Sequence, residues 1–210
     1  MLTSDYKQEN IDCVMDAAFK LCKEIGITAV NKTNLSKASG LSPKSIQRYF
    51  DGKVDMIYKI SKKMLERNYE EIMSNYRACQ PEKYCCTERL QLFLQSHNNY
   101  VLNRYKDMIF IQNADLFCRF GEEKSDKYRH LFCQTSALEK GIGYILNIGF
   151  KDGSINADLD IEKESHLIAI LCAGLVERLS NDIDIDEITI EEAVKVSNDW
   201  IERTAAYLQR

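Results

Sequence analysis

Residues 31–53 read NKTNLSKASGLSPKSIQRYFDGK, and this stretch decides the fold. Asn31 predicts the N-terminal cap of a short helix, and Gly40 predicts its end. Ser42 predicts the cap of a second helix, and Pro43 suits its first position, where a missing N–H costs nothing. The stretch therefore predicts two short helices joined by a tight turn, which is a helix-turn-helix.

The apolar residues of this pair are spaced to pack against a preceding helix. In the first helix these are Leu35 and Ala38, and in the second they are Ile46 and Phe50. A helix of this width fits the major groove of DNA, where Gln and Arg side chains can make paired hydrogen bonds to adenine and guanine edges. The outer side that could do so carries Lys44, Ser45, Gln47, Arg48 and Tyr49.

Apolar residues at steps of three and four predict helices along the rest of the chain. Two prolines among 210 residues are too few for the many turns of an all-β fold. We predict an all-α fold of about nine helices, with a three-helix head over residues 1–53 and a helical body over 54–210, linked by the helix that begins near Lys53. The expected helices cover 11–25, 32–39, 43–50, 53–76, 88–102, 105–119, 126–149, 161–179 and 190–208, and an acidic loop covers 181–188.

The charge of the chain is distributed unevenly. There are 28 Lys and Arg against 32 Asp and Glu, a net charge of −4, yet residues 26–53 hold five basic side chains against Asp51 alone. A basic head on an acidic remainder favours a local nucleic-acid contact over a protein that coats nucleic acid along its whole surface. The hydrophobic fraction of 45% excludes a largely disordered chain.

The eight cysteines are expected to be free thiols in a cytoplasmic protein, because the first residues have no apolar signal core. No Cys or His spacing indicates a metal site, and no apolar stretch reaches the roughly 18–20 residues of a membrane span. Cys85-Cys86 is expected to be an exposed pair between helices, and the sequence leaves open whether it is redox-active. The cysteines expected inside buried helical patterns are Cys13, Cys22, Cys118, Cys133 and Cys172.

Catalytic patterns are missing from the sequence. There is no nucleophile elbow and no HExxH, and His97, His130 and His166 are scattered without an Asp or Ser partner set. We therefore expect neither an enzyme nor a resident cofactor. Gly141 and Gly143 are unusual inside a helix, since each costs about 1 kcal/mol relative to Ala; they could open ligand space, kink the helix or permit close packing.

The head resembles the DNA-binding domain of the TetR family of transcriptional regulators over residues 11–56. The departures are serine for the usual alanine at Ser36 and Ser39, glutamine for the usual tyrosine at Gln47, and lysine for an apolar residue at Lys32. The matching residues are Ile11, Ala17-Ala18-Phe19, Gly26, the run Leu35-Ser36-Lys37-Ala38-Ser39-Gly40-Leu41-Ser42, the run Ser45-Ile46-Gln47-Arg48-Tyr49-Phe50, and Lys53.

The resemblance implies a ligand-responsive repressor that binds a palindromic operator as a homodimer. It implies base contacts from Pro43, Lys44, Ser45, Gln47 and Arg48, and phosphate contacts from Asn31, Thr33, Tyr49 and Lys53. It also implies an effector pocket in the body, and the richness of that region in aromatic residues suggests an apolar or aromatic small molecule. The candidate pocket residues are Phe93, His97, Tyr100, Phe110, Phe117 and Tyr144.

The last two predicted helices are the natural dimer interface, and a two-fold dimer would present two heads to DNA. Part of the set must face the protomer core instead. The alternative left open is a co-regulator of the same fold that acts through a protein partner without binding operator DNA. The candidate interface residues are Leu167, Ile170, Leu171, Gly174 and Leu175, with Val194, Trp200 and Ile201.

Overall fold

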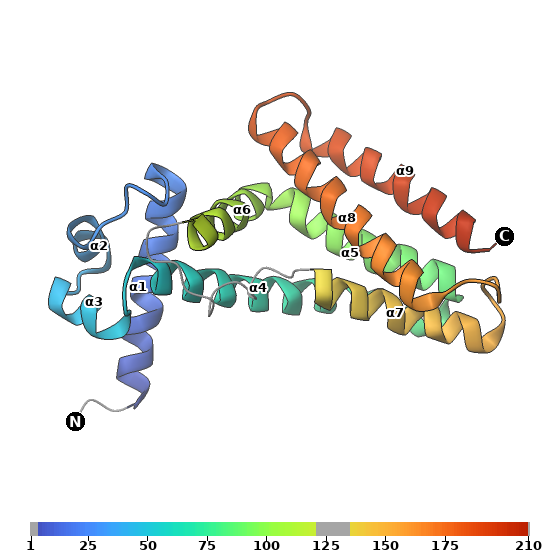
Figure 1. Ribbon diagram of the computed structural model, residues 1–210, viewed down its shortest axis with the longest axis horizontal. Coiled ribbons are helices and arrows are strands. Elements are labelled where there is room, and N and C mark those ends of the chain that lie inside the picture. Colours follow the sequence, from blue (N-terminus) through green and yellow to red (C-terminus); the bar gives the residue numbers. More distant parts are fainter. Residues whose placement is uncertain (1–3, 121–134, 210) are drawn as a thin grey trace. The chain divides into compact units, whose positions relative to one another are not determined.

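A computed structural model describes residues 4–120 and 135–209, and every regular element in these ranges is helical (Figure 1). This confirms the predicted all-α fold. Residues 126–134 of the predicted seventh helix lie outside the described residues. The helices are α1 (Ser4–Ile25), α2 (Lys32–Ser39), α3 (Pro43–Tyr49), α4 (Lys53–Ala78), the 3₁₀ turn η1 (Pro81–Lys83), α5 (Cys86–Asn103), α6 (Tyr105–Phe120), α7 (Thr135–Asp152), α8 (Ile161–Asp184) and α9 (Ile190–Leu208).

The chain forms two compact units, one of Met1–Arg67 with Phe110–Phe132 and one of Asn68–Ile109 with Cys133–Arg210. The change from one unit to the other therefore falls within α4 and within α6. The reason is that the first half of α4 shares its apolar core with α1–α3. The assignment of separate functions to residues 1–53 and 54–210 stays a prediction.

The first unit is held together by one apolar core. Steps of three and four along α1 bring Val14, Ala18 and Cys22 onto one buried face, as the sequence predicts. Burial of a Val, Leu or Ile side chain stabilises a fold by about 1.5–3 kcal/mol, so this core dominates the stability of the unit. The other main contributors are Leu35, Ile46, Phe50, Val54, Ile57, Ile60, Phe110, Ile111 and Ala114.

Helix α5 is the central element of the second unit, where it packs against α7, α8 and α9. Its buried face carries Leu90, Phe93 and Leu94, and farther along the same helix Asn98 is fully buried. A buried amide is costly unless its hydrogen bonds are made. The partners of Asn98 therefore fix how α5 sits on α8 and α9.

Helix α8 is longer than predicted, since it ends at Asp184 and not near residue 179. In the segment that suggests an acidic loop, Asp182 pairs with Arg178 and Ile183 is buried, and of its acidic residues only Asp186 and Glu187 follow the end of the helix. The start of α9 is confirmed: Thr189 Oγ1 accepts a hydrogen bond from the N–H of Glu192 at 3.2 Å, and the Glu192 carboxylate accepts one from the N–H of Thr189 at 2.8 Å.

The cysteines depart from prediction at two positions. All those in the described residues are free thiols, but Cys13 is exposed, and of the Cys85-Cys86 pair only Cys85 is exposed. Cys86 begins α5 and packs its sulfur against α7, donating to the Ile145 carbonyl at 3.2 Å. Cys22, Cys118 and Cys172 are buried as predicted, and Cys133 lies outside the described residues.

The glycines of α7 permit close helix packing, one of the three roles that the sequence allows, and Gly143 also lines a groove between α7 and α8. A Cβ atom on Gly141 would lie 2.5 Å from the Phe93 ring, and one on Gly143 would lie 3.2 Å from Ser165 Oγ. Gly149 is the tightest case, because its added Cβ would lie 2.6 Å from the Cβ of Cys86. A Cβ cannot rotate away as the end of a long side chain can, so only a shift of the helices could relieve this overlap.

We therefore predict that Gly149→Ala destabilises the protein by about 1–3 kcal/mol, despite the better helix propensity of alanine. Denaturant unfolding followed by circular dichroism measures this. Lys151→Ala, an exposed change in the same helix, is the matched control and should leave stability within about 0.5 kcal/mol. An unchanged midpoint for Gly149→Ala would show that α5 and α7 are not packed this closely.

Candidate functional site

Helix α2 begins at a complete cap. The side-chain oxygen of Asn31 accepts hydrogen bonds from the N–H groups of Thr33 at 2.9 Å and Asn34 at 3.0 Å, and the Asn34 side chain accepts one from the Asn31 N–H at 2.8 Å. At the other end Gly40 takes the left-handed conformation, with φ of 71°, and donates to the Ser36 carbonyl at 3.0 Å. Both predicted ends of α2 are therefore confirmed.

Helix α3 follows after three residues. Ser42 Oγ accepts a hydrogen bond from the Ser45 N–H at 3.1 Å, and Pro43 occupies the first position, as predicted. Ile46 and Leu35 are buried, but Ala38 is exposed, so it does not join the packing expected of it. The two short helices thus form the predicted helix-turn-helix and hold to the core by one face each.

An ion pair on α4 holds the end of α3; its Asp55 carboxylate is buried, whereas the Lys59 side chain is 40% exposed. No pattern in the sequence indicates this pair. Lys59 Nζ donates to the Asp55 carboxylate at 2.7 Å and to the Tyr49 carbonyl at 3.2 Å. The same ammonium lies 5.4 Å from the centre of the Phe50 ring. Asp55 also accepts a hydrogen bond from the Asp51 N–H at 3.1 Å. These contacts fix the chain where α3 ends and α4 begins.

The outer face of α3 is open. Lys44, Gln47 and Arg48 are exposed, and within the described residues neither cation has a carboxylate partner. Pro43 is exposed too, whereas Ser45 is half-buried with its hydroxyl 3.0 Å from that of Ser42. An exposed helical face with two unneutralised cations and an amide offers the donors that guanine and phosphate oxygens accept.

The residues predicted to contact phosphate are in three different situations. Asn31 and Thr33 are exposed at the start of α2, with the Asn31 side chain engaged in the cap, and Tyr49 is half-buried against the core. Lys53 instead donates its ammonium to the Thr28 carbonyl at 2.7 Å, and the ammonium lies 5.4 Å from the Phe117 ring centre. Burial lowers the pKa of Lys53. Its contact with DNA stays a prediction.

The candidate interface residues fall into two groups. On α8 an exposed apolar strip runs along Leu167, Ile170, Leu171 and Gly174, each about half exposed where it carries a side chain. Leu175, Val194 and Trp200 are half-buried. Ile201 is 0% exposed and belongs to the core of the second unit, so it cannot contribute an accessible side chain.

The candidate pocket residues belong to different clusters. Phe110 and Phe117 pack in the core of the first unit, and Phe93 lies in the core of the second. Tyr100 is buried in the second unit, and Tyr144 is 72% exposed. Their assignment to one effector pocket stays a prediction.

His97 belongs to a buried polar network centred on Asn98. The Asn98 amide donates to Ser197 Oγ at 2.8 Å, and its oxygen accepts from the Cys172 thiol at 3.0 Å. His97 Nδ1 lies 2.8 Å from the same oxygen, and burial lowers the pKa of the ring, which keeps it neutral at pH 7. Burial raises the pKa of Cys172 to about 12. The network ties α5 to α8 and α9.

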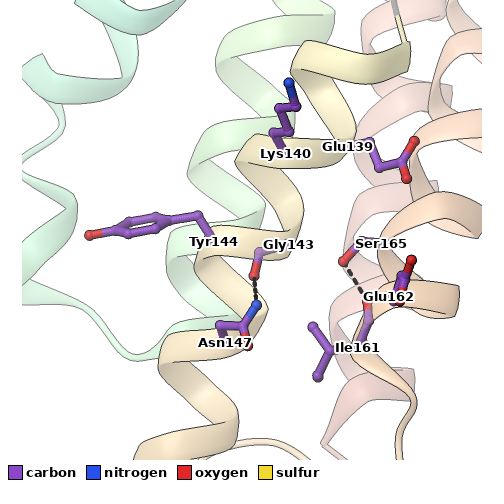
Figure 2. A pocket seen from close by; sticks show the side chains of 8 residues that line it. All are labelled: Glu139, Lys140, Gly143, Tyr144, Asn147, Ile161, Glu162 and Ser165. Atoms are coloured by element: carbon purple, nitrogen blue, oxygen red, sulfur yellow. Dashed lines mark hydrogen bonds between the residues drawn. The ribbon is translucent and has the colours of Figure 1, made fainter.

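In the second unit, a groove between α7 and α8 has a volume of about 510 Å³ (Figure 2). Two of its polar side chains are committed to their own helices, since Asn147 donates to the Gly143 carbonyl at 2.7 Å and Ser165 to the Ile161 carbonyl at 2.6 Å. Figure 2 shows Tyr144 directed away from Ser165. A second groove, of about 490 Å³, lies between α4 and α5, and four of its ten lining residues are amides.

Among residues 4–120 and 135–209 there is no group of three or more His, Cys, Asp or Glu side chains that could hold a metal ion. Within the same described residues, no helix is long and apolar enough to cross a membrane.

Comparisons with known proteins place this arrangement in a class. No family model matches the chain, and no curated protein matches it. Solved structures do: a TetR transcription regulator from Haloarcula marismortui has a TM-score of 0.75 at 17% identity, covering 97% of this chain and 100% of that one. PfmR, a TetR-family regulator from Thermus thermophilus, has a TM-score of 0.60 at 19% identity, covering 94% of this chain and 99% of that one.

A third structure carries a ligand. It is the transcriptional regulator FadR from Bacillus subtilis in complex with stearoyl-CoA, with a TM-score of 0.64 at 18% identity, covering 92% of this chain and 97% of that one. A helix-turn-helix unit followed by an all-helical unit defines the class. The chain has the fold of TetR-family transcriptional regulators, which confirms the resemblance seen in the head and extends it over nearly the whole chain.

The cap of α2 gives a prediction for stability. Asn31→Ala removes the acceptor of two backbone N–H groups, and we expect a loss of about 0.5–2 kcal/mol of unfolding free energy. Thermal or denaturant unfolding measures it. Lys20→Ala, an exposed change within α1, is the control and should cost less than about 0.5 kcal/mol. Equal stability of the two variants would mean that the cap contributes nothing.

Proposed function

We propose that the chain is a DNA-binding transcriptional regulator that docks α3 in the major groove. The observation that carries this proposal is the outer face of α3, where Lys44, Gln47 and Arg48 are exposed and uncommitted while both ends of the helix are fixed by caps and by Lys59. Rigid support under an exposed basic face is what recognition of base edges requires, because contact geometry there must be held within a fraction of an ångström.

The residue types fit this role. Arg48 and Lys44 can donate to guanine O6 and N7, and Gln47 can pair with adenine N6 and N7. Pro43 and Ser45 lie at the start of α3, the end that helix-turn-helix proteins bring to the bases. Asn31, Thr33, Tyr49 and Lys53 surround this face in the sequence and are proposed to contact phosphates. The acidic remainder of the chain disfavours non-specific binding along DNA.

The regulator is proposed to act as a homodimer. The strip Leu167, Ile170, Leu171 and Gly174 exposes apolar side chains along α8, next to α9, and a monomer would leave them in water. A two-fold pairing of these helices would present two heads to an operator with two-fold symmetry, so that half-sites lie about one helical turn or more apart. Each head then adds its binding energy to the other's.

The dimer is proposed to be a repressor that a small molecule controls. The stearoyl-CoA complex of FadR supports a small-molecule site in a body of this fold. An effector that binds one body geometry better than another shifts the population toward it and changes how the heads meet DNA. We further propose that the protein is cytoplasmic and has no catalytic function, in keeping with neighbours that are transcription regulators.

Selection from random duplex DNA tests this function directly. The purified protein, at about 150 mM salt to suppress phosphate-only binding, should enrich an inverted repeat. Enrichment of an inverted repeat supports both operator recognition and the two-fold dimer. No enrichment, repeated after any co-purified ligand is removed by unfolding and refolding, would favour the alternative, a co-regulator that binds a protein partner.

Arg48→Ala should weaken binding to the selected duplex by about 1–3 kcal/mol, roughly 5- to 150-fold, and relax the preference at one base position. Fluorescence anisotropy with the selected duplex and with single-base variants of it measures both effects. Arg77→Ala removes an exposed arginine from the last turn of α4 and should bind as the parent does. Wild-type affinity for Arg48→Ala would contradict the docking of α3.

Leu171→Glu should shift the dimer toward monomer by about tenfold or more in dissociation constant, because an unpaired carboxylate would be buried in the interface. Sedimentation velocity over a range of protein concentrations measures the shift. Ile185→Glu places the same charge on an exposed apolar residue beyond the end of α8 and should leave the dimer intact. Equal behaviour of the two variants would move the interface away from the α8 strip.

A further inference from the structure

The groove between α4 and α5 lies in the second unit and is distinct from the helix-turn-helix. Two contacts set the register of its walls: Tyr100 Oη donates to Asn68 Oδ1 at 3.1 Å, and the rings of Tyr76 and Phe93 meet edge to face at 5.3 Å between centres. Long side chains thus bridge the two helices, and a groove of about 490 Å³ lies beside them. That volume is in the range of small-molecule sites. The groove is lined by Glu71, Asn75, Cys79, Leu92, Gln95, Ser96, Asn99, Tyr100, Asn103 and Arg104.

The lining is unusually polar for a ligand site, because amides and a hydroxyl outnumber apolar side chains. Some of these groups are committed to their own helix: Ser96 donates to the Leu92 carbonyl and Asn103 to the Asn99 carbonyl, both at 2.7 Å. Asn99 differs. Its side-chain oxygen is buried and has no hydrogen-bond partner among the described residues. Leaving a buried polar atom unpaired costs about 1–3 kcal/mol, so the site calls for a donor.

At one end of the groove, Arg104 needs a hydrogen-bond acceptor, whereas Asn99 needs a donor. Its guanidinium lies 4.9 Å from the centre of the Tyr100 ring, which orients it, and within the described residues it has no carboxylate partner. A guanidinium held in this way favours a planar carboxylate that can accept two hydrogen bonds. Glu71, also in the lining, accepts hydrogen bonds but cannot donate them when ionised.

We propose that this groove binds a small carboxylate that also carries hydroxyl or ammonium hydrogen-bond donors. The carboxylate pairs with Arg104, and the donors satisfy Asn99 Oδ1 and Glu71. This differs from the apolar or aromatic effector that the aromatic residues suggest, because those residues lie mainly in the two cores and not in this lining. This inference rests on the proposed function in one respect: it takes the bound carboxylate to be the effector of the regulator.

The fold supplies a route from this groove to the proposed dimer helices. Asn99 faces the groove, and the next residue back, Asn98, bonds to Ser197 on α9 and to Cys172 on α8. A ligand that holds one side of α5 therefore acts on a helix whose other side is fixed to both dimer helices. Movement of α5 would alter the strip around Leu171 without any ligand contact to it.

Protection of Cys79 from alkylation tests the site without DNA. Cys79 lines the groove and is exposed, while Cys13 and Cys85 are exposed outside it and serve as internal controls. The native protein is treated with iodoacetamide, and peptide masses report the rate at each cysteine. The probes are the twenty L-amino acids and the hydroxy acids malate, citrate and gluconate, each up to about 10 mM, with hexanoate and sorbitol as controls.

The expected result is a saturable slowing at Cys79 alone by at least one amino or hydroxy carboxylate, with none by hexanoate or sorbitol. Whether amino acids or hydroxy acids protect Cys79 shows which of the two classes the groove binds. No protection by any probe would overturn the proposal. Equal protection by hexanoate would overturn the requirement for donors, and protection by sorbitol would overturn the role of the carboxylate.

Variants assign the two partners. Arg104→Ala and Asn99→Leu should each weaken the affinity for the protecting probe by about tenfold or more. Arg77→Ala, which removes an arginine of α4 outside the lining, should leave this affinity unchanged. Circular dichroism confirms that each variant is folded. Undiminished protection in both lining variants would place the ligand elsewhere. If a probe protects Cys79 but no operator is selected from random DNA, the ligand site is upheld and the proposed DNA-binding function is rejected. If an operator is selected but no probe protects Cys79, the DNA-binding function is upheld and the ligand site is rejected.

Discussion

Helix α3 has only seven residues, and a helix of that length does not hold its shape in water. Its shape depends on burial of Ile46, on the Ser42 cap and on Lys59, which draws the Tyr49 carbonyl and the Asp55 carboxylate together. Because the inner face and both ends supply the stability, the outer face is free to carry residues chosen for contact with a partner. The proposed function depends on this separation of roles.

The second unit is organised by a different constraint, a polar network in an otherwise apolar core. Asn98 is fully buried and bonds to Ser197 and Cys172, so α5 can sit on α8 and α9 in one register without leaving an amide unpaired. Close packing of α7 on α5 through Gly141 and Gly149 adds a steric limit to the same helix. Because α5 is held firmly to α8 and α9 on one side, it is suited to transmit to them the effect of a ligand bound on its other side.

The sequence predicted the helices best where caps mark their ends: α2 and α9 have the expected bounds because Asn31, Gly40 and Thr189 make local hydrogen bonds. It failed where tertiary contacts decide. The end of α8 was placed too early, since burial of Ile183 holds an acidic segment helical, and the burial of Cys86 depends on α7. The α4–α5 groove could not be predicted, because its register depends on side chains that meet across two helices, and no pattern along one helix records that.

The central claim is that α3 reads DNA in the major groove, and methylation interference on the selected duplex tests it most directly. Dimethyl sulfate modifies guanine N7 in the major groove and adenine N3 in the minor groove, so one reaction reports both faces. The account predicts interference at guanine N7 in two symmetric half-sites whose centres lie about one helical turn or more apart. Interference confined to adenine N3, or to one site without a symmetric partner, would contradict it.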